Sequence, residues 1–183
     1  GVENIVYRDW DDPTPGPGEV AVRVAACGLN HLDIFVRRGM PGFPVPMPFI
    51  SGGDIAGTID SLGDDVTGWE VGQRVTMNPQ TDHGMIGEEL IGGLAELVCV
   101  PAVNLVNLPD NVSFETAAAI PINYGTAHRM LFARGRLQAG ETMLVLGASG
   151  GVGLASLQFG KMVGATVIAA AGSQDKCDRL LDL

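Results

Sequence analysis

The sequence contains few cationic residues: 11 Lys and Arg stand against 21 Asp and Glu, which gives a formal net charge of −10. Only two of these cations are lysines, Lys161 and Lys176. A groove that follows a phosphate backbone needs a basic patch, so we expect neither nucleic acid nor an anionic membrane as a partner. The chain also lacks an apolar run of the ~18–20 residues that span a membrane, and we expect no signal peptide because no basic and then apolar leader is present.

Cysteine and histidine are equally scarce. The three cysteines are far apart and form no CxxC pair: Cys27, Cys99 and Cys177. This argues against a disulfide scaffold and a cysteine-based zinc knuckle, and predicts a reducing, cytoplasmic location. The three histidines are dispersed and are not predicted to form a metal cluster: His31, His83 and His128.

Glycine and proline, by contrast, are frequent, with 26 and 11 residues, and they predict many turns. The stretch 19–25 alternates apolar with polar or small residues, as a half-buried strand does. Further strands are predicted over 54–62, 72–77 and 95–100. Short strands separated by turns, with little helix between them, indicate a small barrel or sandwich.

The pattern changes near residue 112. Ser113 is predicted to cap a helix over 114–120, which Pro121 ends because proline breaks a helix interior. A second helix is predicted over 124–134, with Gly135 as the residue that follows its end. The second part of the chain is therefore predicted to be largely helical at its start.

A strand, a glycine-rich loop, a helix and another strand follow in that order. The apolar run 142–146 predicts a strand buried on both faces of a parallel sheet. The helix is predicted to end near Val163, the next strand covers 166–171, and Ser173 begins another helix. This order is typical of the first βαβ unit of a Rossmann sheet, which two strands alone do not complete.

The loop between the first strand and its helix carries glycines in a GxxGxxG spacing. Such glycines permit a tight turn and a close approach of backbone N–H groups to a pyrophosphate at the helix N-terminus. The flanking strand and helix make this interpretation more specific than the glycines alone. The alternative is a turn that only lets helix and strand pack closely. The residues predicted to contact the cofactor here are Gly147, Ser149, Gly150, Gly151, Val152 and Gly153.

The end of the second strand bears on cofactor choice. An NAD site places Asp or Glu there, ~20 residues beyond the glycines, to hold the ribose 2′-hydroxyl. This strand ends without an acid, and Ser173 and Lys176 can instead bind a 2′-phosphate. Asp175 argues against this, and the alternative is that Ser173 only caps a helix and Lys176 is a solvated surface residue. The absence of the acid favours NADP(H).

Six further segments occur in a recognisable order: PGPGEV (15–20), CGLNHLD (27–33), GDIAG (53–57), VGQRV (71–75), GGLAE (92–96) and PINYGT (121–126). With the glycine-rich loop, they resemble the medium-chain dehydrogenase/reductase superfamily, and within it the zinc-independent quinone oxidoreductase and alcohol-dehydrogenase-like branch. The resemblance implies a β plus α/β fold. Residues 1–113 would form a GroES-like β-barrel catalytic domain, and residues 114–183 the N-terminal, incomplete part of a Rossmann domain.

Full members of this family are longer, so we expect the chain to be a fragment whose complete form is a homodimer or homotetramer. In the zinc-dependent members, the three catalytic zinc ligands match Asn30, Gly53 and Ile122 of this sequence. These residues are poor or impossible ligands, so no metal is expected. The proton-relay hydroxyl position of those members falls at Leu32.

The resemblance implies hydride transfer from a nicotinamide bound between the two domains. Asn30, His31 and Asp33 would act from the barrel, with Asn30 and His31 donating hydrogen bonds to the carbonyl oxygen as negative charge develops on it. Thr126 would contact the cofactor. The alternative for Asn30 and Asp33 is a structural hydrogen bond that fixes the loop, and Tyr124 would either stack near the nicotinamide or belong to the core.

The sequence thus predicts a zinc-free, NADPH-dependent reductase of a small quinone or α,β-unsaturated carbonyl. Two other functions stay open. One is an alcohol dehydrogenase that binds zinc in an unconventional way. The other is a non-catalytic NADPH-binding protein with a sensor or structural role, which the loss of the zinc-binding residues favours.

Overall fold

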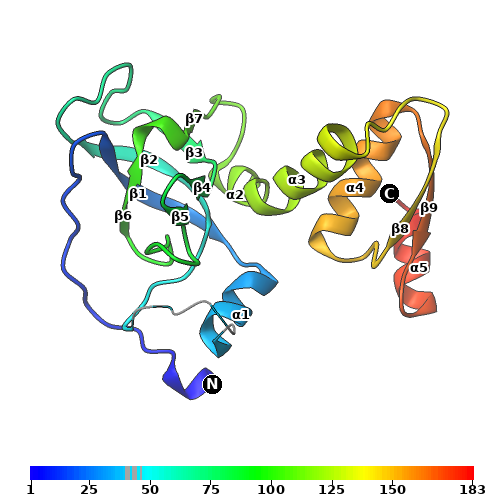
Figure 1. Ribbon diagram of the computed structural model, residues 1–183, viewed down its shortest axis with the longest axis horizontal. Coiled ribbons are helices and arrows are strands. Elements are labelled where there is room, and N and C mark those ends of the chain that lie inside the picture. The colour runs from blue at the N-terminus through cyan, green and yellow to red at the C-terminus, as the bar shows by residue number, and fades with distance from the viewer. Residues whose placement is uncertain (40–41, 43–44, 46) are drawn as a thin grey trace. The chain divides into compact units, whose positions relative to one another are not determined.

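The computed structural model describes residues 1–39, 42, 45 and 47–183, and it divides into two compact units, Gly1–Ile122 and Asn123–Leu183 (Figure 1). The sequence places the domain boundary between residues 113 and 114, and that position stays a prediction. Helix α2 (Phe114–Ala118) belongs to the first unit, where Ala117 and Ala118 are buried in a small cluster with Ala56 and Leu108.

The first unit is built on an antiparallel sheet with the strand order β6-β1-β2-β3-β7. Its strands are β1 (Glu19–Gly28), β2 (Asp54–Leu62), β3 (Arg74–Met77), β6 (Leu97–Pro101) and β7 (Leu105–Asn107). A short hairpin of β4 (Gln80–Thr81) and β5 (Gly84–Met85) follows β3. Four of these strands were predicted within a few residues, because their apolar residues alternate toward one core. The core is lined by Val20, Val22, Ile55, Ile59, Val75, Met77, Ile86, Val98, Val100 and Leu105.

The sequence analysis missed one helix of this unit. Helix α1 (His31–Arg38) begins three residues after β1 ends and has the predicted catalytic residues at its start. Two short 3₁₀ turns, η1 (Val2–Asn4) and η2 (Ala102–Asn104), complete the unit. Ser113 caps α2 as predicted, since its hydroxyl oxygen accepts a hydrogen bond from the Thr116 N–H at 3.2 Å.

Helix α3 (Pro121–His128) begins at the residue that was expected to end the preceding helix. Proline is well suited to the first helical turn, where its missing N–H has no intrahelical acceptor to satisfy. The predicted helix over 124–134 therefore starts earlier, and from Arg129 it continues as a π-helical segment, η3 (Arg129–Arg134).

The second unit contains the predicted βαβ arrangement, with β8 (Thr142–Leu146) parallel to β9 (Thr166–Ala170) and helix α4 (Gly151–Val163) between them. Helix α5 (Gln174–Leu181) follows. Gly164 ends α4 in the left-handed region, with φ of 83°.

The expectation that β8 is buried on both faces is wrong for this chain. Helix α4 packs on one face, where Met143 and Val167 approach Gly160. The alternate residues point the other way because side chains alternate along a strand. Leu144, Leu146 and Ile168 are therefore 61%, 76% and 53% exposed.

Candidate functional site

Asn30 and Asp33 lie at the start of α1, where the chain leaves β1. Asn30 is the N-cap residue, and the Asp33 carboxylate accepts its backbone N–H at 2.7 Å, which forms a capping box. The other Asp33 oxygen accepts the backbone N–H of Gly52 at 2.9 Å. Both carboxylate oxygens of Asp33 thus accept hydrogen bonds from backbone N–H groups, as in the alternative in which Asp33 fixes the loop. An acid–base role for Asp33 stays a prediction.

The Asn30 side chain is directed at a buried carboxylate. Its Nδ2 donates a hydrogen bond to Oδ2 of Asp54 at 2.8 Å, and the backbone N–H of Ile122 donates to Oδ1 at 2.7 Å. Asp54 is only 1% exposed, so burial raises the pKa of its carboxyl group. The hydrogen bonds from Asn30 and Ile122 lower that pKa, and the negative charge of Asp33 raises it.

Sequence reasoning did not select Asp54 as a site residue. The sequence does contain an indication of its role, because Asp54 is the first residue of β2 and the next five residues are apolar, small or hydroxylic. A carboxylate in that position is rarely buried without hydrogen-bond partners. Its partners, however, come from α1 and from Ile122, and the sequence does not show that these segments meet.

The three positions that match zinc ligands in the family do converge. Asn30 and Ile122 both hydrogen-bond to Asp54, and a Cβ placed on Gly53 would lie 3.0 Å from Cδ1 of Ile122 and 2.7 Å from the Ile86 carbonyl oxygen. The space for a side chain at Gly53 is therefore filled. A carboxamide, a glycine and an alkyl group do not fit the donor set of zinc. Among the residues that the structure describes, no group of three or more His, Cys, Asp or Glu could hold a metal ion.

The other predicted residue of α1, His31, is exposed, and its ring centroid lies 6.4 Å from that of Phe35. Leu32 is partly buried. Cys27 lies nearer to the carboxylates, at the end of β1. Burial, together with Asp33 and Asp54, raises the pKa of its thiol to about 12, so the thiol is protonated and a poor nucleophile at neutral pH.

The glycine-rich loop has the geometry that a pyrophosphate requires. Gly147 adopts a φ of 64°, in the left-handed region, and directly follows β8. Cβ atoms on Gly151 and Gly153 would each lie 2.4 Å from an oxygen atom, Oδ1 of Asn123 and the Gly147 carbonyl respectively. Glycine adopts this conformation and this close packing at no steric cost because it has no Cβ.

The N-terminus of helix α4 follows the glycine-rich loop directly. Its N-cap, Gly150, makes no side-chain cap bond, and the first N–H groups of an α-helix have no intrahelical acceptor. Gly147, Ser149 and Gly150 are exposed, while Val152 and Gly153 are partly buried. This loop fits the phosphates of a dinucleotide.

The remaining cofactor candidates lie at two other places in the second unit. Ser173 is the N-cap of α5 but makes no side-chain cap bond, and both Ser173 and Lys176 are exposed. Asp175 is exposed in the same first turn. Thr126 is exposed on α3. These polar side chains are accessible.

Tyr124 and His128 pack α3 against α4. The Tyr124 hydroxyl donates a hydrogen bond to Oε1 of Gln158 at 2.7 Å, and its ring meets that of Phe159 edge to face. The His128 ring contacts Phe132 and Phe159. This geometry matches the alternative in which Tyr124 packs in the core rather than stacking near the nicotinamide.

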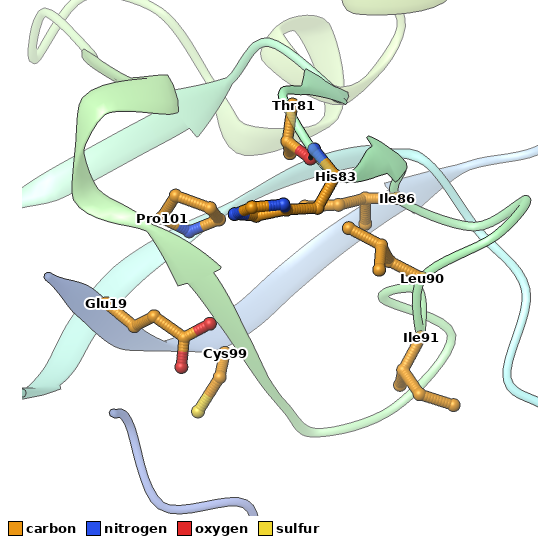
Figure 2. A pocket seen from close by; sticks show the side chains of 8 residues that line it. All are labelled: Glu19, Thr81, His83, Ile86, Leu90, Ile91, Cys99 and Pro101. Carbon is orange, nitrogen blue, oxygen red and sulfur yellow. Dashed lines mark hydrogen bonds between the residues drawn. The ribbon is translucent and has the colours of Figure 1, made fainter. Parts of the chain in front are cut away.

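The barrel also has a hollow of about 240 Å³ beside the β4–β5 hairpin (Figure 2). It is lined by Glu19, Thr81, His83, Ile86, Leu90, Ile91, Cys99 and Pro101. Burial, and then the Glu19 carboxylate, raise the pKa of the Cys99 thiol to about 11. None of the predicted site residues lines this hollow, which separates it from the cluster around Asp54.

In the part of the chain that the structure describes, no helix combines the length and the apolar character that crossing a bilayer requires.

Comparisons with known proteins agree with the barrel and the βαβ unit. The alcohol dehydrogenase GroES-like domain family matches residues 16–110. The chain is 37% identical over 163 residues to the quinone oxidoreductase of Mus musculus, covering 89% of this chain and 46% of that protein. It is 36% identical over 170 residues to the synaptic vesicle membrane protein VAT-1 homolog-like of the same species, covering 93% of this chain and 38% of that protein.

Among solved structures, an NAD-dependent alcohol dehydrogenase superimposes with a TM-score of 0.88 at 38% identity, covering 96% of this chain and 56% of that one. The chain thus spans about half, or less, of the length of the relatives that it matches. The predicted fold, a GroES-like barrel followed by the start of a Rossmann domain, is confirmed. The chain belongs to the medium-chain dehydrogenase/reductase superfamily, through its alcohol dehydrogenase GroES-like domain and its quinone-oxidoreductase-like relatives.

Proposed function

We propose that the protein containing this chain is an NADPH-dependent reductase of quinones or α,β-unsaturated carbonyls that works without zinc. One observation carries the proposal: the three family zinc-ligand positions converge on Asp54 but hold a carboxamide, a glycine and an alkyl group. The glycine-rich loop follows these positions along the chain and keeps its tightly packed glycines. A relative at 37% identity is named quinone oxidoreductase.

A bound nicotinamide supplies the hydride. The barrel then supplies hydrogen-bond donors for the carbonyl oxygen, on which negative charge develops as the substrate is reduced. We assign this role first to the Asn30 carboxamide, because Asp54 and the capping box fix its position. His31 is the second candidate, and solvent provides the proton. Asp33 holds the loop that carries both residues.

The second unit binds the cofactor. Backbone N–H groups of Gly147, Gly150, Gly151, Val152 and Gly153, with the Ser149 side chain, hold the pyrophosphate at the start of α4. Ser173 and Lys176 bind the 2′-phosphate, and Thr126 contacts the nicotinamide half. The negative charge of Asp175 opposes the binding of a 2′-phosphate here. The lack of an Asp or Glu at the end of β9 supports it, because an NAD site has such an acid.

The test is to measure NADPH and NADH oxidation by the complete protein with a benzoquinone and a panel of enones, alongside its metal content. Turnover with NADPH in metal-free protein is expected. Tighter binding of NADH than of NADPH would overturn the cofactor assignment. Stoichiometric zinc would instead support an alcohol dehydrogenase with an unconventional site, and nucleotide binding without turnover would support a sensor or structural role. A homodimer or homotetramer and a cytoplasmic location also remain predictions.

A further inference from the structure

Asp54 is a buried carboxylate whose recorded hydrogen-bond donors are neutral. Both of them, Nδ2 of Asn30 and the backbone N–H of Ile122, carry no charge. Neither salt bridge recorded within the described residues includes Asp54. A buried ionised group without a counter-ion destabilises a fold, whereas an apolar or amide residue of similar size avoids this penalty. The folding of the barrel alone does not explain a carboxylate here.

The contacts of Asp54 give a better reason for a carboxylate at this position. An ionised carboxylate only accepts hydrogen bonds, so Asn30 must present its N–H group rather than its oxygen. The capping box fixes the same residue at its backbone. The second carboxylate oxygen holds the backbone at Ile122, in the first turn of α3. One side chain therefore sets the rotamer and the amide orientation of Asn30.

The space around Asp54 leaves it little freedom. A Cβ on Gly28 would lie 3.0 Å from the Asp54 Cβ and 2.3 Å from the Ala118 carbonyl oxygen, so β1, β2 and α2 are in close contact here. Asp33, at the start of α1, is the titratable group that acts on Asp54, and Asp54 in turn raises the pKa of the Cys27 thiol on β1. Neither group is a cation, and among the described residues no cation is found to lower the pKa of the Asp54 carboxyl group.

We propose that Asp54 is the positioning residue of the hydride-transfer site, and that its ionised form fixes the rotamer and the amide orientation of the Asn30 carboxamide. This inference rests on the proposed function, since it assigns to Asp54 the orientation of the group that meets the substrate oxygen. Protonation of Asp54 creates a hydrogen-bond donor at its carboxyl group, which permits the Asn30 carboxamide to rotate by half a turn. The catalytic rate is therefore expected to fall at acidic pH.

The first test compares Asp54→Asn with Asp60→Asn in the complete protein. Asp60 lies on the same strand, at the surface, where it pairs with Arg23 at 2.7 Å, so it controls for the loss of one carboxylate from β2. In Asp54→Asn, kcat is expected to fall about 10- to 100-fold. KM and the Kd for NADPH are expected to stay within about twofold. The Asp60→Asn protein is expected to match the wild type in kcat, in KM and in the Kd for NADPH. A folded Asp54→Asn protein with an unchanged kcat overturns the proposal.

A second variant separates positioning from simple stabilisation. Exchanging the two residues, as Asn30→Asp with Asp54→Asn, restores a carboxamide–carboxylate pair but places the acceptor on the substrate side. Stability is expected to recover relative to Asp54→Asn, whereas kcat is expected to stay low. Recovery of kcat together with stability shows a structural role only and contradicts the proposal.

The third readout does not depend on activity. The ¹⁵N and ¹H resonances of the Asn30 side-chain amide, assigned by comparison with Asn30→Gln, are followed through a pH titration. They are expected to shift with the ionisation of Asp54, at the pH where kcat falls. If the wild type reduces neither quinone nor enone, the proposed function fails while this titration still decides the inference. An Asn30 resonance that does not follow Asp54 overturns it in either case.

Discussion

Gly153 packs so closely against Gly147 that a Cβ placed on it would lie 2.4 Å from the Gly147 carbonyl oxygen. The obstructing atom belongs to the backbone, so no side-chain rotation relieves the contact. Gly150, in the same loop, would place its Cβ 3.4 Å from that oxygen, which is an ordinary contact distance. Alanine should therefore disrupt the loop at position 153 and be tolerated at position 150.

Gly153→Ala is expected to lower the free energy of unfolding by about 1–3 kcal/mol, as overpacking of a tight contact does. Gly150→Ala is expected to change it by less than about 0.5 kcal/mol. Gly150→Ala should nevertheless weaken NADPH binding by about tenfold or more, since the added methyl group lies at the exposed helix N-terminus. Urea unfolding and nucleotide titration of both variants measure this. Equal stability losses would contradict the geometry of the loop.

Lys176→Ala is expected to raise the Kd for NADPH by about tenfold, corresponding to ~1.4 kcal/mol, and to leave the Kd for NADH unchanged. The reason is that only NADPH carries the 2′-phosphate. Lys161→Ala is the control, because Lys161 is the other lysine of the chain and lies in the last turn of α4. A similar loss of affinity for both nucleotides in Lys176→Ala would exclude a 2′-phosphate contact.

Ser113→Ala is expected to destabilise the protein by about 1 kcal/mol, because the Ser113 hydroxyl caps α2 through the Thr116 N–H. Ser173→Ala is a matched control, since Ser173 is also an N-cap residue but makes no side-chain cap bond. Without nucleotide, the control should differ from the wild type by only a few tenths of a kcal/mol. Thermal unfolding of the two variants side by side checks this, and an equally large loss in Ser173→Ala would be inconsistent with the structure.

The thiols of Cys27 and Cys99 are expected to react slowly with iodoacetamide at pH 8. Their pKa values are raised to about 12 and about 11, mainly by burial, so thiolate is scarce until the pH is strongly alkaline. As the pH rises, Cys99 should react before Cys27. Peptide mapping by mass spectrometry measures both rates, with urea-unfolded protein as the reference. Alkylation of Cys27 at pH 8 as fast as in urea would contradict its burial.

Stability should rise on mild acidification through Asp54. Its carboxyl pKa is raised in the folded state, chiefly by burial, above the usual value of 3.8 for an aspartate. The folded protein therefore takes up this proton before the unfolded chain does, and the free energy of unfolding increases as the pH falls from the folded pKa toward that value. Urea unfolding at several pH values should show this slope in the wild type, relative to Asp54→Asn. Parallel curves for the two proteins would rule out a raised pKa.

The sequence by itself determined the elements whose signals are local. The glycine spacing over 147–153 and the apolar run before it specify the loop, β8 and α4, because a tight turn before a helix needs glycines and the preceding strand needs consecutive apolar residues. The alternation in 19–25 likewise indicated β1. Ser113 marked the start of α2 because a side-chain cap acts within three residues.

The tertiary structure alone decided what surrounds Asn30. Asp54 is 24 residues from Asn30 and 68 from Ile122, and only the packing of β1, β2 and α2 brings the three together. The helix α1 that carries Asn30 was also missed, since its start depends on the Asp33 carboxylate, which holds Gly52 as well. Hydrogen bonds between distant segments leave no periodic trace in a sequence. The loop could therefore be predicted from its residues, and the role of a single buried carboxylate could not.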